Sequence, residues 1–365
     1  MRNAIEIHAL TKRYGILTAL DEVSFEVGRG ELFGLIGPDG AGKTTLFRLL
    51  ATLVAPDGGT ASVDGLDIVA DYKRIRERVG YMPGRFSLYP DLSVGENLAF
   101  FAALFGVEIA ENYDLVAPIY RQIEPFRARR AGKLSGGMKQ KLALCCALIH
   151  RPAVLLLDEP LGALDLKLRK EMQIELKRIQ QQMEITFIYV THDQEEALTM
   201  SDTVVVMKDG TIQQIGTPQD IYNEPKNAFV ADFIGESNIL PGIMHKDFLV
   251  EFAGNNFECV DKGFAPMEPV DVVIRPEDIQ LVPASDEVLN GVVENVQFKG
   301  VHYEIIVRAY SDTWIVHSTK APEVGSIVGI TLTPEDIHIM KKSNVKKIDY
   351  LKSESEAEKD IEHKI

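Results

Sequence analysis

The stretch LFGLIGPDGAGKTT, residues 32–45, decides the fold of this chain. Its first five residues form a short apolar run of the kind found in a strand buried on both faces of a parallel sheet. The rest contains the pattern G-x-x-x-x-G-K-[ST], with Gly37, Gly42, Lys43 and Thr44 at the specified positions. A helix-like apolar run follows it. A strand, a glycine-rich turn and a helix in this order predict a phosphate-binding loop.

Each part of this loop has a physical role. Glycines let the backbone wrap a phosphate without Cβ clashes, and the amides at the helix start point at the anion. Lys43 neutralises phosphate charge, and the Thr44 hydroxyl can ligate Mg²⁺. An ordinary glycine-rich turn is the alternative, which the flanking strand and helix disfavour. The residues predicted to hold the nucleotide phosphates here are Gly37, Pro38, Asp39, Gly40, Ala41, Gly42, Lys43, Thr44 and Thr45.

Further apolar runs at 154–157, 186–190 and 204–207 alternate with helix-like segments, which predicts α/β architecture over the first ~235 residues. The first of these runs ends at Asp158 and Glu159. A carboxylate in the position of Asp158 can hold the water shell of Mg²⁺, and Glu159 can polarise a water that attacks the γ-phosphate. A solvated strand end explains such a pair equally well until the phosphate loop is considered.

A third motif, Ser135-Gly136-Gly137, precedes the helical stretch 139–149. A serine and two glycines at a helix start expose N–H donors and a hydroxyl, which predicts a second anion-binding helix terminus. Taken alone, the same residues are equally typical of a plain helix N-cap.

Beyond about residue 237 the pattern changes to short alternating stretches separated by prolines and glycines, which predicts a small β-rich domain. The tetrapeptide Pro-Glu-Asp-Ile occurs at 276–279 and again at 334–337, which indicates two related β units. Residues 343–365 are rich in charge, so we expect a disordered tail there.

The order of these motifs resembles that of the ATP-binding subunit of an ABC (ATP-binding cassette) transporter. The resemblance covers about residues 1–342 and implies an α/β P-loop NTPase fold followed by a small all-β, OB-like TOBE domain. The expected boundaries are 1–236 for the ATP-binding domain, with a helical subdomain at about 84–150, and 237–342 for the TOBE domain.

The resemblance also implies functional roles. Tyr14 is expected to stack on adenine, and His192 to contact the γ-phosphate beside the catalytic Glu159. Ser135 and Gly137 are expected to reach the γ-phosphate of an ATP held by a second copy of the chain. Gly136 and Asp165 complete the predicted nucleotide-binding set. A packing role for Tyr14 and a plain surface role for His192 are the alternatives.

The partners implied are a second ATPase subunit, two transmembrane permease subunits and, for an importer, a periplasmic or lipoprotein substrate-binding protein. The expected cofactors are ATP and Mg²⁺, and the expected place is the cytoplasmic face of the inner membrane. Two positions depart from the family pattern: Gly84 stands where a glutamine is usual, which puts metal coordination and coupling there in doubt, and Met138 replaces another glutamine.

The two halves of the chain resemble different subfamilies. Residues up to about 149 are similar to bacterial drug-export ATPases, whereas those from 161 on are similar to the ATPase of a spermidine/putrescine importer. We therefore expect a chimera joined near 150–160. The candidate functions are a polyamine-import motor and, alternatively, a drug-export motor; a soluble ABC ATPase of ribosomes or DNA repair and a non-hydrolysing binding module are less well supported.

The composition is close to that of an ordinary soluble globular protein. The 365 residues carry a net charge of −15, which disfavours nonspecific nucleic-acid binding. The three cysteines, Cys145, Cys146 and Cys259, have no metal-ligand spacing and are expected to be buried thiols. No apolar run reaches about 18 residues, and the first residues do not form a signal peptide, so membrane work is expected to go through a partner.

Overall fold

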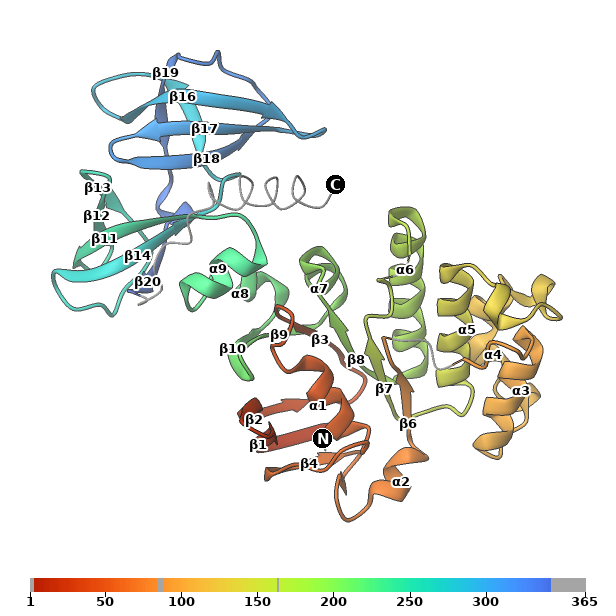
Figure 1. Ribbon diagram of the computed structural model, residues 1–365. Coiled ribbons are helices and arrows are strands. Elements are labelled where there is room, and N and C mark those ends of the chain that lie inside the picture. Colours follow the sequence, from red (N-terminus) through yellow and green to blue (C-terminus); the bar gives the residue numbers. More distant parts are fainter. Residues whose placement is uncertain (1–2, 85–87, 163, 343–365) are drawn as a thin grey trace. The chain divides into compact units, whose positions relative to one another are not determined.

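The computed structural model describes residues 3–84, 88–162 and 164–342 of the chain. It divides into two compact units, 1–224 and 225–365, each with its own buried core (Figure 1). The predicted tail at 343–365 lies outside the described residues.

The first unit is built on a six-stranded sheet with the order β10-β9-β3-β8-β7-β6. Its strands are parallel except for β10, which is antiparallel to β9. Every residue of β3, β7 and β8 is buried, so the apolar runs of the sequence are strands covered on both faces, as predicted. The bounds are β3 (Leu32–Ile36), β6 (Val79–Met82), β7 (Val154–Asp158), β8 (Thr186–Thr191), β9 (Thr203–Lys208) and β10 (Thr211–Gly216).

A second, antiparallel sheet of this unit has the order β2-β1-β4-β5. Its apolar side chains share one core with those of α1, the helix that follows the phosphate loop. The strands are β1 (Ile5–Tyr14), β2 (Leu17–Val27), β4 (Gly58–Val63) and β5 (Leu66–Asp67).

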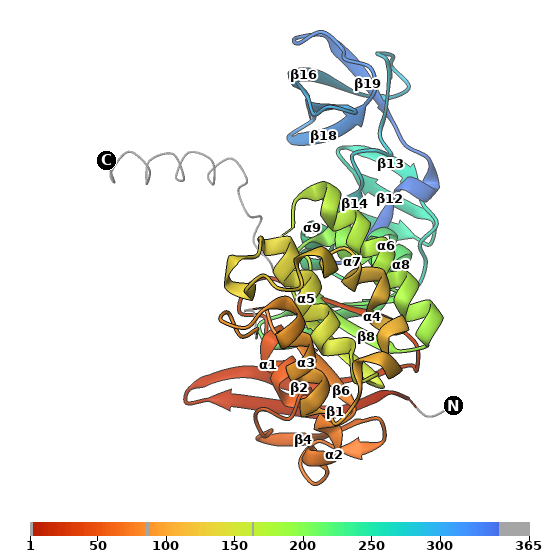
Figure 2. The same ribbon diagram turned by 90° about the vertical axis from the view of Figure 1, so that its right-hand side faces the viewer.

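A separate helical core fills the region after β6, where α3, α4 and α5 lie side by side in both views (Figures 1 and 2). The helix α6 has one apolar face, because Met172, Leu176 and Ile179 are buried and Leu168 packs against the same core. The helices are α1 (Lys43–Leu50), α2 (Tyr72–Arg76), α3 (Val94–Leu104), α4 (Tyr113–Tyr120), α5 (Gly136–Leu148), α6 (Leu166–Met183), α7 (Gln194–Met200) and α8 (Pro218–Asn223).

The second unit holds two five-stranded sheets with the same plan. One has the order β13-β12-β11-β14-β20 and the other β18-β17-β16-β19-β15. If β11–β15 form the first repeat and β16–β20 the second, each sheet contains four strands of one repeat and the last strand of the other. The strands are β11 (Asn238–Lys246), β12 (Leu249–Phe252), β13 (Asn255–Glu258), β14 (Glu268–Ile274), β15 (Gln280–Pro283), β16 (Leu289–Phe298), β17 (Tyr303–Ala309), β18 (Asp312–Ser318), β19 (Ile327–Thr331) and β20 (His338–Lys341).

The repeated tetrapeptide lies at the two exchange points. Each copy follows the fourth strand of its own repeat and leads into the strand that completes the other sheet. Its isoleucines, Ile279 and Ile337, are 3% and 1% exposed and share one core. The two copies therefore anchor equivalent turns, which accounts for the internal repeat.

The helix α9 (Ala228–Ile234) belongs to the second unit, although the predicted boundary falls after residue 236. Ala231 packs against Val273 of β14, and the Arg275 guanidinium donates to the Ala231 carbonyl at 3.0 Å. These contacts are long-range, and the composition changes only after the helix, so the sequence pattern placed the boundary too late.

Within the described ranges, no helix is long and apolar enough to cross a membrane.

Candidate nucleotide site

The loop 37–45 joins β3 to α1 and is shaped by close backbone packing. Gly42 caps α1 with φ of 99°, in the left-handed region. A Cβ there would lie 2.4 Å from the carbonyl oxygen of Ala19, so only glycine fits. The helix N-terminus is thereby left with backbone amides and no side-chain cap, which suits an anion.

Lys43 lies inside the curve of this loop. Its Nζ donates to the carbonyl oxygens of Gly37 and Pro38, at 2.6 and 2.9 Å. Burial lowers the pKa of Lys43, and the nearby carboxylates of Asp39 and Glu159 act in the opposite direction. Among the described residues, the hydrogen bonds of this mostly buried ammonium group go to carbonyl oxygens, an arrangement that suits a phosphate.

The predicted magnesium ligands lie together. Asp158 ends β7 and is 7% exposed; the Gly84 N–H and the Thr44 hydroxyl lie close enough to its carboxylate to lower the pKa of that group. Burial, and then the charge of Glu159, raise the pKa of Asp158. A carboxylate beside a hydroxyl is the oxygen donor set that Mg²⁺ prefers, so these residues fit the ion.

Glu159 and His192 face each other across the ends of β7 and β8. His192 Nδ1 lies 3.4 Å from Glu159 Oε1, and both side chains are well exposed. Glu159 has φ of 51°, an unusual conformation for a non-glycine residue, and its N–H donates to the Val190 carbonyl at 3.0 Å. The structure thus brings together the two residues predicted to act at the γ-phosphate.

Gln140 is a site residue that the sequence analysis missed. It lies on α5, is 5% exposed, and its side-chain amide donates to the Glu159 carbonyl at 3.3 Å. The signal available in the sequence is a glutamine on the otherwise apolar side of the helix that follows the Ser-Gly-Gly motif. A buried polar side chain at such a position requires a partner.

Ser135 is the N-cap of α5, where its hydroxyl accepts from the Met138 N–H at 3.4 Å. Its side chain is exposed, and in the described part of the chain no hydrogen bond joins it to the loop 37–45. Figure 1 shows α5 well apart from α1, with strands of the central sheet between them. Within one chain, the serine motif and the phosphate loop are therefore separate half-sites.

Two predicted residues lie at the edge of this site. Tyr14 ends β1 with a ring that is 42% exposed, and Lys12 Nζ lies 5.5 Å from its centroid. A side chain with this exposure is accessible to a base from solvent, as stacking requires. Asp165 is the N-cap of α6, where its side chain accepts from the Leu168 N–H at 3.0 Å; its role toward a nucleotide stays a prediction.

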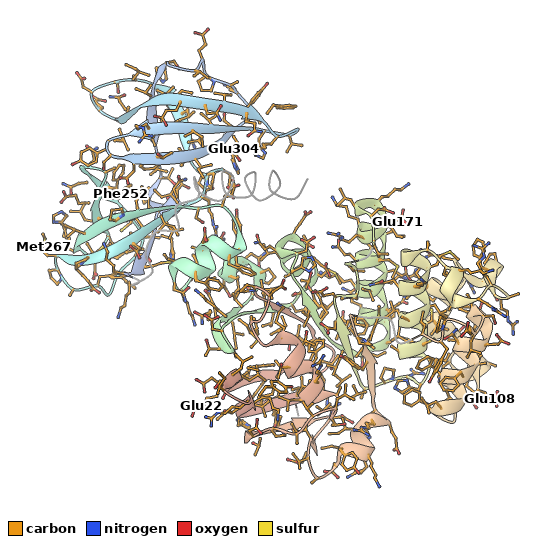
Figure 3. The ribbon with its side chains drawn as sticks, in the orientation of Figure 1. Glu22, Glu108, Glu171, Phe252, Met267 and Glu304 are labelled. Carbon is orange, nitrogen blue, oxygen red and sulfur yellow. The ribbon has the colours of Figure 1, made fainter. Side chains whose placement is uncertain are left out.

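Another group with metal-ligating chemistry lies in the second unit, where Glu236, Glu304 and His317 bring one ligand atom each within 4.8 Å of the others (Glu304 is labelled in Figure 3). His317 Nε2 is already paired with Glu236 at 3.2 Å, and Lys299 pairs with Glu304 at 3.3 Å. Ion pairing therefore accounts for this group without a metal.

Comparison with known proteins supplies the family. The ABC transporter model matches residues 20–162, and the TOBE domain model matches residues 272–340. The spermidine/putrescine import ATP-binding protein PotA of Desulfitobacterium hafniense is 51% identical over 346 residues, covering 93% of this chain and 97% of that protein. The chain belongs to the ABC transporter ATP-binding proteins. The PotA protein of Clostridium novyi is also 51% identical, over 93% of this chain and 98% of its own length.

Solved structures agree with this assignment to the ABC family. The dimeric structure of MJ0796, a bacterial ABC transporter cassette, is 26% identical with a TM-score of 0.54, covering 59% of this chain and 98% of that one. A post-hydrolysis state of the same cassette, bound to ADP and phosphate, is 25% identical with a TM-score of 0.54. The ABC ATPase fold and its binding of ATP are therefore shared by this chain.

The chimera interpretation is not supported. The PotA relatives align over 93% of the chain, which includes both sides of the supposed join at 150–160. A single ABC family therefore accounts for both halves, and the export-like phrases in the first 149 residues need no separate origin.

Proposed function

We propose that this ABC ATPase is the motor subunit of a polyamine importer that acts on spermidine or putrescine. Two observations support the proposal. The phosphate loop, Asp158, Glu159 and His192 are assembled in one chain, and relatives that are half identical over nearly the whole length carry the name of spermidine/putrescine import proteins. The choice of substrate rests mainly on these relatives, because an ATPase subunit does not itself touch the transported molecule.

The chemistry follows from the geometry of the chain. The amides of loop 37–45 and Lys43 hold the phosphates of ATP. Glu159 accepts a proton from the attacking water, and His192 is close enough to contact the same phosphate region. Mg²⁺, held through Asp158 and Thr44, would neutralise phosphate charge when bound.

The second half-site implies a partner. The exposed serine motif at Ser135–Gly137 is complete as a helix N-terminus but has no phosphate loop of its own chain against it. Two copies arranged head to tail would close each ATP between Lys43 of one and Ser135 of the other. Hydrolysis then removes the γ-phosphate link and reopens the pair, a ligand-biased two-state equilibrium. Permease subunits at the cytoplasmic face of the membrane would convert it into transport.

Phosphate release from Mg·ATP tests the enzymatic part. Glu159→Gln keeps the shape of the side chain but removes the base, so hydrolysis should fall about 10²-fold or more. The matched control is Glu195→Gln, an exposed glutamate on α7, which should hydrolyse at the parent rate. Parent-level hydrolysis by Glu159→Gln would remove the base assignment.

Uptake of labelled spermidine by cells tests the substrate. A strain that lacks its own copy of the gene should lose uptake and regain it with the parent chain, but not with Glu159→Gln. If uptake is unaffected while resistance to exported drugs depends on the chain, the import proposal fails and the drug-export alternative replaces it.

A further inference from the structure

Glu196 is a buried carboxyl group close to the site that no step of the proposed chemistry uses. It lies in the first turn of α7 and is 3% exposed. Its Oε2 accepts a hydrogen bond from the Thr191 hydroxyl at 3.0 Å, while Oε1 has no hydrogen-bond partner among the described residues. Burial of a carboxyl group with one oxygen lacking a hydrogen bond is energetically unfavourable, so its presence here requires an explanation.

The hydrogen bonds of Glu196 involve the residues immediately before and after His192 in the chain. Thr191, just before the histidine, donates to Glu196 and accepts from the Asp193 N–H at 3.0 Å. Asp193, just after the histidine, accepts from the Glu196 N–H at 3.1 Å. The backbone on either side of His192 is therefore fixed by a closed ring of bonds that passes through the Glu196 side chain.

Outer contacts hold this ring in place. The Arg169 guanidinium, from α6, donates to Asp193 Oδ2 at 2.5 Å. The Tyr189 hydroxyl, from β8, donates to the Glu196 carbonyl at 3.2 Å. Arg169 is thus engaged by Asp193, and among the described residues no ion pair is formed by Glu196.

We propose that Glu196 is a positioning residue for hydrolysis, which holds residues 191–193 so that the His192 imidazole stays against Glu159. This inference rests on the proposed ATPase function and adds to it a residue that touches neither nucleotide nor metal. A shift of the histidine by about 1 Å would be enough to lower the rate substantially.

The charges around Glu196 agree with a group that works in its neutral form. The pKa of Glu196 is raised to about 7, mainly by burial; the charges of Asp193 and Glu159 also raise it, while the Thr191 hydrogen bond and Arg169 lower it. Below about pH 7 the ring therefore contains a neutral carboxyl group that a glutamine can imitate, whereas ionisation at higher pH places a third negative charge beside Asp193 and Glu159.

Steady-state hydrolysis separates a positioning role from a merely structural one. Glu196→Ala should lower kcat about tenfold while KM for ATP changes less than about twofold. The parent should show an inflection of kcat near pH 7, and Glu196→Gln should keep most of kcat but lose that inflection. Thr191→Val, which keeps the side-chain shape and removes the hydroxyl, should reproduce the loss seen with Glu196→Ala.

The most decisive experiment uses a variant that lacks the His192 imidazole. In a His192→Ala background, Glu196→Ala should cause no further loss of kcat, because the residue to be positioned is gone. An additional tenfold loss there, or parent kcat in folded Glu196→Ala and Thr191→Val, would overturn the proposal. If the parent chain itself hydrolyses no ATP, the proposed function fails rather than this inference. The control variant is Glu195→Gln, an exposed residue of the same helix.

Discussion

The side-chain amide of Gln140 and the backbone carbonyl of Glu159 are joined by a hydrogen bond of 3.3 Å. The same carbonyl accepts from the Gly162 N–H at 3.3 Å, and the N–H of Glu159 is bound by the Val190 carbonyl. The left-handed backbone at Glu159 is therefore held from three directions, and Gln140 is the one that comes from a side chain. It links the helix of the serine motif to the predicted base.

Removal of this link should impair hydrolysis. Gln140→Ala should lower kcat about tenfold, because Glu159 loses a bond that keeps it in a strained conformation. Gln140→Glu should do the same, since a carboxylate cannot donate to a carbonyl. Gln181→Ala, an exposed glutamine on α6, is the control. Full activity of folded Gln140→Glu, measured as phosphate release, would show that the donor is dispensable.

Gly84 has room for the Cβ atom of the glutamine that the family pattern has at this position. A Cβ there would lie 3.5 Å from the Asp158 carbonyl oxygen and 3.8 Å from its carboxyl carbon, which are ordinary contacts. Gly84→Gln should therefore leave ATP affinity within about twofold and change hydrolysis only when it is coupled to transport. Reconstituted vesicles that show an unchanged coupled rate would argue against a coupling role for this position.

His150 should make stability fall in acid. Its ring stacks on Phe105 with centroids 3.7 Å apart, and burial lowers the pKa of His150 to about 4. The unfolded chain takes up this proton below about pH 6.5 and the native chain only near pH 4, so the free energy of unfolding should decrease by on the order of 3 kcal/mol across that window. Urea unfolding of His150→Phe should lack this part of the pH dependence; an identical slope in both chains would contradict it.

Arg275 should anchor α9 to the second unit. Its guanidinium is 5% exposed and donates to the carbonyls of Ala231, Gly235 and Glu236. Arg275→Met would keep much of the packing and remove these charge-assisted hydrogen bonds, at a cost of about 2–4 kcal/mol. Hydrogen exchange should report faster exchange in α9, with Arg308→Met, an exposed residue of β17, as control. Unchanged protection of the α9 amides would refute this anchoring role.

Much of the fold could be predicted because its determinants are local. Continuous apolar runs mark β3, β7 and β8, and the glycine pattern marks the loop, since both follow from steric and burial requirements of a few neighbouring residues. The exchange of β15 and β20 between sheets could not be predicted, because it depends on which distant edge each strand pairs with.

In the site, too, local features could be predicted and long-range contacts could not. Lys43, Asp158 and Glu159 could be predicted from strand ends and motif order, whereas the support of Glu159 by Gln140 and of His192 by Glu196 could not. Those contacts join residues from separate elements or depend on the backbone conformation of a turn. The sequence offers one hint of such a contact, a polar residue such as Gln140 on an otherwise apolar helix face.

The central claim is that ATP closes two copies of this chain on each other, and the mass of the particle tests it most directly. In sedimentation with Mg·ATP, Glu159→Gln should form a particle of twice the 40.6 kDa chain mass and return to a monomer without nucleotide. Adding Ser135→Arg to this variant should abolish the dimer while ATP still binds at Lys43. A monomer at saturating ATP, or a dimer that survives Ser135→Arg, would contradict the account.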